Sequence, residues 1–225
     1  MIYVYAITDA AAPPPRRGLD DAELRTVGED GLFAVVSEHA EAAVEGTEEN
    51  LWTHEEVVEA LLDAAAVLPL RFGSMVEDAE AVRALLDGRR REFEATLARV
   101  RGAVELGVRV ALPDAEGAAV GAGARRAEGA GPGTAYMLSR LDRERRAADA
   151  VARIHGPLAG LARESVRADR SLDRFALTAS YLVDIDRVDT FRALVDELAD
   201  ELDGATIVCT GPWPPYSFSS PGDER

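Results

Sequence analysis

Apolar and polar positions alternate along residues 175–185. The apolar members of this run are Phe175, Leu177, Ala179, Tyr181, Val183 and Ile185. A period of two residues is typical of a strand with one buried face, because successive side chains of a strand point to opposite sides. The pattern therefore predicts a strand over this segment.

Apolar side chains then recur at helical spacing along one face. They are Val188, Phe191, Leu194, Val195, Leu198 and Leu202. We expect Asp186 to accept a backbone N–H at the start of this helix and Gly204 to end it. Residues 205–210 predict a further strand. The two strands that flank the helix should run parallel, either paired directly or with another strand between them.

Two strands are also predicted near the N-terminus. Residues 2–8 are mostly β-branched and aromatic, and prolines at 13–15 close the run. Residues 31–37 form a short apolar run introduced by the pair Asp30-Gly31. We expect the strand at residues 2–8 to be its neighbour in a sheet.

Helical patterns dominate the middle of the chain. Thr53 and Glu56 have the spacing of a capping box and predict the start of a helix. The apolar stripe of this helix consists of Val57, Val58, Leu61, Leu62 and Ala65. Pro69 cannot continue it, so residues 68–74 should be extended. A second helical pattern begins near Glu77 and should kink or break at Gly88, since glycine is unfavourable inside a helix.

The second half of the chain begins with a strand predicted over residues 105–112. Residues 113–133 are rich in glycine and alanine without apolar periodicity, which predicts a flexible loop. A long helix is expected from Thr134, with a bend at the pair Gly156-Pro157.

These elements predict an α+β protein of two domains. Residues 1–104 should form an N-terminal α+β domain, and residues 105–225 a C-terminal domain that contains the long helix. The element order of the second domain is that of a modified ferredoxin-like fold in which one hairpin strand is missing or altered.

Composition limits the function classes. The formal net charge is −16 and the pI is near 4.6. Such an excess of negative charge disfavours binding to nucleic acid or to anionic membrane surfaces. One cysteine, Cys209, excludes an intramolecular disulfide and favours a reducing cytoplasm. We expect neither a secretion signal nor a membrane span, because no apolar stretch is long enough.

The chain lacks the motifs of familiar catalytic sites. Its three histidines, His39, His54 and His155, lie in different predicted elements and lack the spacing of metal ligands. Neither a nucleophile elbow nor a GxGxxG motif is present. We therefore expect no enzyme activity, cofactor, metal or small-molecule substrate.

The segment GPWPPYSF at residues 211–218 is the least usual in the chain. Its prolines lack a backbone N–H and hold an extended conformation, so we expect them to end strand pairing. Trp213, Tyr216 and Phe218 then lie on a stiff segment. This segment is either a lid over the core or an exposed docking edge.

Several of these segments resemble the gas vesicle accessory proteins of the GvpF/GvpL family. The resemblance is most specific in TGPWPPYSF at residues 210–218 and in LPLRFG at residues 68–73. It extends to LTASYLVDIDRVDTF at residues 177–191, to His54, and to residues 105–112 and 133–138. The resemblance implies a cytoplasmic or vesicle-associated accessory or minor structural protein. Its expected partners are the small hydrophobic shell protein and other accessory proteins during nucleation and growth of the vesicle.

Five residues are candidates for contact with such a partner. They are Arg71, Phe72, Trp213, Tyr216 and Phe218. Arg71 has a structural alternative, in which its guanidinium neutralises neighbouring carboxylates. The competing hypothesis for the whole protein is a regulatory sensor or enzyme on ferredoxin-like modules. In that case Arg71 would bind an anion, and Tyr181 or Trp213 would line a cleft.

Overall fold

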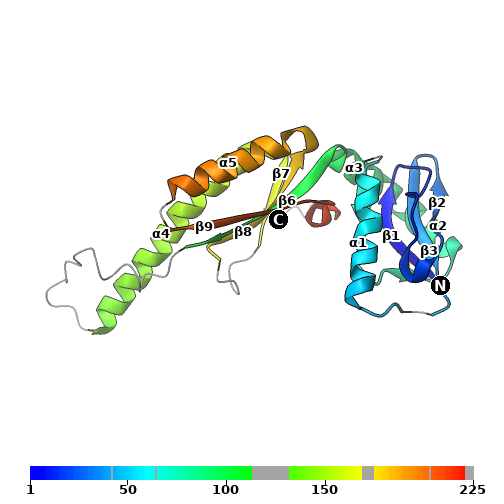
Figure 1. The fold of residues 1–225 in the computed structure, drawn as a ribbon, viewed down its shortest axis with the longest axis horizontal. Helices are drawn as coiled ribbons and strands as arrows, with labels where there is room; N and C mark the ends of the chain where they lie inside the picture. Colours follow the sequence, from blue (N-terminus) through cyan, green and yellow to red (C-terminus); the bar gives the residue numbers. More distant parts are fainter. Residues whose placement is uncertain (42, 64, 113–131, 169–174, 203, 221–225) are drawn as a thin grey trace. The chain divides into compact units, whose positions relative to one another are not determined.

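The computed structural model describes residues 1–41, 43–63, 65–112, 132–168, 175–202 and 204–220 (Figure 1). These residues form helices and two β-sheets, which confirms the predicted α+β class. Contacts group the chain into two compact units, Met1–Glu105 with Pro212–Arg225, and Leu106–Gly211. The sequence-based division placed all residues from 105 onward in one domain, whereas this grouping places the tail with the first unit.

The first unit is built around one central strand. In its sheet the strand order is β2 (Arg25–Glu29), β3 (Leu32–Glu38), β1 (Ile2–Thr8) and β4 (Val67–Pro69), and β5 (Met75–Val76) also pairs with β1. The predicted strand at residues 2–8 and its pairing with the strand after Asp30-Gly31 are confirmed, and the pair is antiparallel. All seven residues of β1 are buried. Both faces of this strand are therefore covered.

One face of this sheet carries helix α1 (Glu48–Leu62). Tyr3 and Tyr5 of β1 belong to a single buried cluster with Val57, Val58 and Leu61 of α1. Helices α2 (Ala79–Gly88) and α3 (Arg90–Val100) contact β2, β3 and β4 and bury their own apolar stripes. The predicted break after Gly88 is confirmed, because α2 ends there and α3 begins two residues later.

The predicted capping box of α1 is wrong. The helix begins at Glu48, and its N-cap is Thr47, whose side chain accepts a hydrogen bond from the Asn50 N–H. Thr53 lies inside the helix, where its hydroxyl donates to the Glu49 carbonyl at 3.0 Å. The error arises because a threonine three residues before a glutamate also occurs within helices, where its hydroxyl bonds to the preceding turn.

A tight hairpin joins β2 to β3. Glu29 pairs with Leu32, so Asp30 and Gly31 form a two-residue loop, and both have positive φ. These are the backbone angles of a type I′ turn, which favours this Asp-Gly pair. Strand β2 was not predicted because only Val27 among its five residues is fully buried. Its apolar pattern is therefore weak.

The second unit has the strand and helix order of the ferredoxin-like fold. Along the chain its elements are β6 (Ala103–Ala111), α4 (Pro132–Leu161), β7 (Glu164–Arg167), β8 (Leu177–Asp184), α5 (Val188–Glu201) and β9 (Thr206–Trp213). In the sheet the order is β7-β8-β6-β9. Strand β6 therefore lies between β8 and β9, which is one of the two predicted alternatives. Strand β7 was not predicted, and it supplies the antiparallel hairpin partner of β8.

Helices α4 and α5 contact each other, and both contact β8, so they lie on one face of this sheet (Figure 1). Tyr181 of β8 contacts both helices: its ring centroid lies 5.2 Å from that of Phe191 of α5, and its hydroxyl is 2.8 Å from Nδ1 of His155 of α4. Helix α4 contains Pro157, and the predicted bend there stays a prediction. Most of the predicted loop at residues 113–133 lies outside the described residues.

Two local predictions in this unit are wrong. Asp186 does not cap α5, because the chain passes through a 3₁₀ turn, Ile185–Arg187, and the N-terminus of α5 has no side-chain cap. The prolines do not end β9 at residue 210, because the strand continues through Pro212 to Trp213. Strand β9 is at the edge of its sheet, where a residue without an N–H loses no ladder bond.

Candidate partner-binding surface

The five candidate contact residues all lie in the first unit, but they differ in exposure. Arg71 is exposed, and Trp213 is 43% exposed. Phe72 and Tyr216 are half-buried, and Phe218 is buried. The tail is therefore a lid at its end and exposed at its beginning, and the docking role of the exposed part stays a prediction.

The tail is anchored by a short 3₁₀ turn, Tyr216–Phe218. The Glu105 carboxylate, which is 8% exposed, accepts hydrogen bonds from the Ser217 N–H at 2.8 Å and from the Ser217 hydroxyl at 2.7 Å. The Arg99 guanidinium donates to the carbonyl oxygens of Phe218 at 2.6 Å and of Ser220 at 2.9 Å. Hydrogen bonds to charged groups are the stronger ones in proteins, so this docking is firm.

His54 lies at the centre of the surface that receives the tail. Its Nε2 is 3.1 Å from the Leu70 carbonyl oxygen, and its Nδ1 is 2.9 Å from the Tyr3 hydroxyl. A carbonyl only accepts, so Nε2 carries the proton and Nδ1 accepts from Tyr3. The Tyr3 hydroxyl in turn accepts from the Gly73 N–H at 3.1 Å. These contacts suit a neutral imidazole, and burial lowers the pKa of His54, which favours the neutral form.

Tyr216 connects the tail to helix α1. Its hydroxyl donates to Glu55 Oε1 at 2.9 Å and lies 3.3 Å from His54 Nε2. Burial raises the pKa of Glu55, and the hydrogen bond from Tyr216 lowers it in part. Burial and then the nearby Glu55 charge raise the pKa of Tyr216, so the phenol keeps its proton and remains a donor. Burial raises the pKa of Tyr3 to about 12 as well.

Phe72 belongs to the same aromatic cluster. Its ring lies edge-on to Tyr3 at 6.0 Å and to His54 at 5.9 Å between centroids. Such edge-to-face packing stabilises a fixed orientation of the rings. Phe72 therefore supports the surface on which the tail docks.

A second chain of hydrogen bonds runs beside the first. The Tyr5 hydroxyl is 2.9 Å from Ser37 Oγ, which is 2.7 Å from His39 Nε2, and His39 Nδ1 is 3.2 Å from Asp20. Sequence reasoning treated His39 and His54 as unrelated because they lie in different elements. The structure brings both rings to within 6.0 Å of Tyr3, measured between centroids.

Arg71 projects from the segment between β4 and β5. In the part of the chain that the structure describes, its guanidinium has no carboxylate partner. Its backbone carbonyl accepts from the Ser74 N–H at 3.2 Å and from the Ser74 hydroxyl at 2.6 Å. The fold therefore holds its backbone and leaves its side chain available for a partner.

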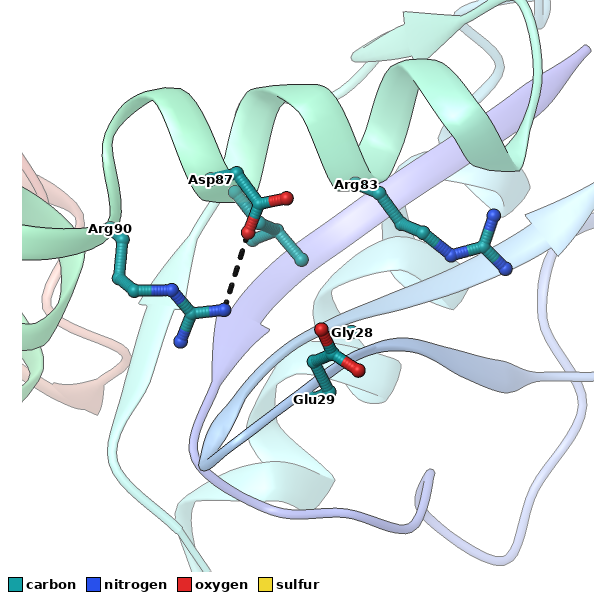
Figure 2. Close-up of a pocket in the computed structure, with 6 residues that line it drawn as sticks. Gly28, Glu29, Arg83, Asp87 and Arg90 are labelled. Carbon is teal, nitrogen blue, oxygen red and sulfur yellow. Dashed lines mark hydrogen bonds and ion pairs between the residues drawn. The ribbon is translucent and has the colours of Figure 1, made fainter.

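Two hollows lie on the first unit and are candidate small-molecule sites. Figure 2 shows the first, of about 70 Å³, where Arg83, Asp87 and Arg90 of the α2–α3 region face Gly28 and Glu29 of β2. This is the volume of about two waters, and Arg90 is already 3.3 Å from Asp87. The second, of about 480 Å³, is lined by Met1, Ile2, Arg25, Glu38, His39, Glu77, Asp78 and Ala79.

Neither hollow is lined by Arg71, Tyr181 or Trp213. They are therefore not the anion cleft of the sensor hypothesis. Both are bordered by charges of both signs, and in the first an ion pair already uses part of the lining.

An exposed apolar pair on α1 was missed by sequence reasoning. Leu51 is 44% exposed and Trp52 is 61% exposed. The signal was present, because Trp52 precedes the buried Leu61 by nine residues. Nine residues are two and a half helical turns, so the two side chains lie on opposite sides of the helix.

Comparisons with known proteins identify the family. The sequence model of the gas vesicle synthesis protein GvpL/GvpF family matches residues 1–220. The chain belongs to the GvpL/GvpF family. Gas vesicle protein F2 of Halobacterium salinarum is 33% identical over 196 residues, which cover 86% of this chain and 78% of that protein. Gas vesicle protein L of Streptomyces sp. (strain CB03234) is 32% identical over 256 residues, which cover 99% of this chain and 94% of that protein.

Solved structures of GvpF proteins have the same fold. The crystal structure of GvpF from Anabaena sp. PCC7120 superposes with a TM-score of 0.83 at 21% identity and covers 99% of each chain. The crystal structure of GvpF from Microcystis aeruginosa superposes with a TM-score of 0.78 at 21% identity and covers 97% of this chain and 98% of the Microcystis chain. Membership of the GvpL/GvpF family makes this chain a gas vesicle accessory protein. Among its described residues, no helix combines the length and apolarity needed to cross a bilayer.

Proposed function

We propose that this GvpL/GvpF protein binds the small hydrophobic shell protein of gas vesicles, or other gas vesicle accessory proteins, while vesicles nucleate and grow. The match of the family to residues 1–220 is the observation that carries the proposal. Under this proposal the protein acts in the cytoplasm and at the vesicle, as an assembly factor without enzyme activity.

The physical character of the chain supports this role. A hydrophobic client needs a partner that offers an apolar contact and still keeps the complex in solution. The net charge of −16 supplies the second property, because like charges keep complexes apart. The exposed Trp213 offers the apolar contact, since tryptophan is among the residues that most often dominate binding energy at interfaces.

The five candidate residues take two roles in this proposal. Trp213 and Arg71 are exposed and contact the partner directly. Phe72, Tyr216 and Phe218 hold the surface in shape through ring packing, the bond to Glu55 and burial. A preorganised surface binds more tightly, because little conformational entropy is lost on binding.

Capture of purified shell protein by immobilised protein tests this proposal. We expect Trp213→Ala to weaken capture by about tenfold or more, because an aromatic anchor contributes roughly 2 kcal/mol at an interface. Trp213→Phe keeps an aromatic ring and should retain most of the capture. Circular dichroism should show both variants folded, since Trp213 is 43% exposed.

Equal capture by folded wild-type and Trp213→Ala proteins would remove Trp213 from the contact. Deletion of the gene in a vesicle-forming host tests the wider role. We expect the loss of buoyant gas-filled bodies, and restoration by the wild-type gene but not by the Trp213→Ala gene. Normal vesicles after deletion would contradict a required assembly role.

A further inference from the structure

Helix α1 presents an outer face that the proposed function does not use. Trp52 on this face is 61% exposed, which is the largest exposed fraction among the large apolar side chains that the structure describes. Leu51, the preceding residue, lies at the flank of this face and is 44% exposed. The opposite face of the same helix is buried against β1 through Val57, Val58 and Leu61. The helix needs its inner face for folding, and the outer face is free for another purpose.

Glutamates surround Trp52 on the helix surface. The positions three and four residues away on either side are Glu48, Glu49, Glu55 and Glu56. Residues at these spacings are the nearest neighbours of a helical side chain. The Trp52 indole N–H is 3.4 Å from Glu48 Oε1, so one carboxylate already lies at the edge of the ring. Helix α1 holds no arginine or lysine that would compensate this charge.

The carboxylates differ in how far they are engaged. Glu56 forms an ion pair with Arg16, and Glu55 accepts from Tyr216. Glu48 and Glu49 are exposed in the first turn, where negative charge also favours the helix dipole. Helix stability thus explains an acidic first turn. It does not explain a tryptophan in water at the centre of the acidic positions.

We propose that the outer face of α1, made of Trp52 with Glu48 and Glu49 and flanked by Leu51, binds a basic segment of a partner protein. A lysine or arginine of that segment would lie over the indole face, where a cation is attracted by the ring. Glu48 and Glu49 would form ion pairs with this lysine or arginine and with a neighbouring cation of the segment. Leu51 would cover the aliphatic part of a basic side chain.

The charge of this face favours a basic segment over an apolar partner, a second copy of the face or a nucleic acid. A purely apolar partner would bury the flanking carboxylates without compensation, which is costly. A second copy of this face would bring two sets of glutamates together, and a nucleic acid would bring phosphates to them. A basic segment alone satisfies both the ring and the carboxylates. This face does not include Trp213, and the inference does not depend on the proposed function.

The sequence makes the site easy to test. All 25 basic residues are arginines, so the chain has no lysine. A carbodiimide that joins carboxylates directly to amines can therefore link this protein to a lysine of a partner, and internal links are limited to the amino group of Met1. Its two tryptophans are Trp52 and Trp213, so the Trp213→Phe protein reports fluorescence from Trp52 alone.

The probe is a synthetic amphipathic peptide with lysines on one helical face and leucines on the other. We expect saturable quenching or a shift of Trp52 fluorescence in the full-length Trp213→Phe protein, and carbodiimide links at Glu48 or Glu49. By isothermal titration calorimetry, Trp52→Ala should weaken binding roughly tenfold. The double variant Glu48→Gln, Glu49→Gln should have a similar effect.

The matched control removes two acids elsewhere. The double variant Glu197→Gln, Asp200→Asn changes the net charge equally at exposed positions of α5, and it should bind the peptide as the wild type does. Three results would each overturn the proposal. They are equal binding by Trp52→Ala, an equal loss in the α5 control, and equally tight binding of spermidine, which would indicate a small-cation site. Retained shell capture by Trp52→Ala would leave the proposed function standing, so the two failures are distinguishable.

Discussion

His54 is buried beneath the tail, and both of its ring nitrogens are engaged. Nε2 faces the Leu70 carbonyl, and Nδ1 faces the Tyr3 hydroxyl, so the ring is held in one orientation, and burial, which lowers its pKa, favours the neutral form. A histidine that serves as a catalytic base needs one nitrogen directed at a substrate. His54 has none to spare, and it acts as a polar bridge between β1, α1 and the segment after β4.

The protonation of His54 should make stability depend on pH. In the unfolded chain the imidazole takes up a proton near pH ~6.5. In the folded protein burial lowers the pKa of His54, so the unfolded state binds more protons as the pH falls below about 6.5. The free energy of unfolding should therefore decrease as the pH is lowered below about 6.5. The slope from one group is at most about 1.4 kcal/mol per pH unit.

Urea unfolding between about pH 7 and pH 5 checks this prediction. His54→Gln should flatten the slope relative to the wild type. Burial raises the pKa of the neighbouring Glu55, which gives a change of opposite sign, and this contribution is common to both proteins. Burial also lowers the pKa of His155, so His155→Gln serves as the comparison for the second unit. An unchanged slope in His54→Gln would contradict the assignment.

At the scale of elements, helix α1 shows how one segment serves folding and recognition together. Its inner side carries His54, Val57 and Leu61, all buried. Its outer side carries Trp52 among glutamates. Since the two sides are separated by half a helical turn, substitutions at Trp52 should leave the fold intact. The same property makes the variants of the further inference interpretable.

The β2–β3 hairpin offers a stability prediction at this scale. Gly28 has φ of +138°, and a Cβ there would overlap the Leu32 carbonyl oxygen. We expect Gly28→Ala to lower the free energy of unfolding by about 1–3 kcal/mol, because the backbone or the strand pair must shift. Chemical denaturation measures this change.

Gly46→Ala is the matched control for the hairpin. Its added Cβ meets no atom within 4 Å, and the backbone angle is ordinary. We expect a change within about 0.5 kcal/mol there. Equal effects of the two substitutions would show that the hairpin geometry at Gly28 is not required.

At the scale of the whole molecule, both ends of the chain contribute to the first unit. The tail from Pro212 belongs with Met1–Glu105. Its hydrogen bonds reach Glu55, Arg99 and Glu105, and Phe218 is 2% exposed. The first unit therefore completes its packing only when the last segment of the chain is present.

A truncation after Gly211 tests this dependence. The loss of the buried Phe218 and of charge-assisted hydrogen bonds should destabilise the first unit by roughly 3 kcal/mol or more. Hydrogen exchange should show faster exchange of the β1 amides, with β8 amides little changed. A chain that ends at Ser220 keeps every tail contact described here and serves as the control. Unchanged β1 protection after the longer truncation would contradict the assignment of the tail to this unit.

Much of the local structure could be predicted from the chain itself. The period of two residues in residues 175–185 and the burial of Val188, Phe191 and Val195 at helical spacing correspond to β8 and α5. The Asp30-Gly31 pair correctly marked the start of a strand, but the hairpin that this strand forms with β2 was missed. Strands β2 and β7 were not predicted. Few of their side chains are buried, so their sequences show no clear alternation of apolar and polar residues.

The candidate site was predicted less completely. The tail was recognised as unusual, but its division into an exposed Trp213 and a buried Phe218 depends on contacts across the fold. Tyr216 meets Glu55 over a separation of 161 residues, and Arg99 meets Phe218 over 119. Local patterns carry no information on pairs so distant.

The amino-acid sequence by itself determined the strand and helix periods, the strong negative charge and the lack of familiar catalytic motifs, because each of these is a property of neighbouring residues or of composition. Only the tertiary structure decided that the tail completes the first unit, that His54 is a neutral bridge and that Trp52 remains in water. These three features depend on which residues, distant in the sequence, come into contact. Such contacts are set by packing of the whole core rather than by any one segment.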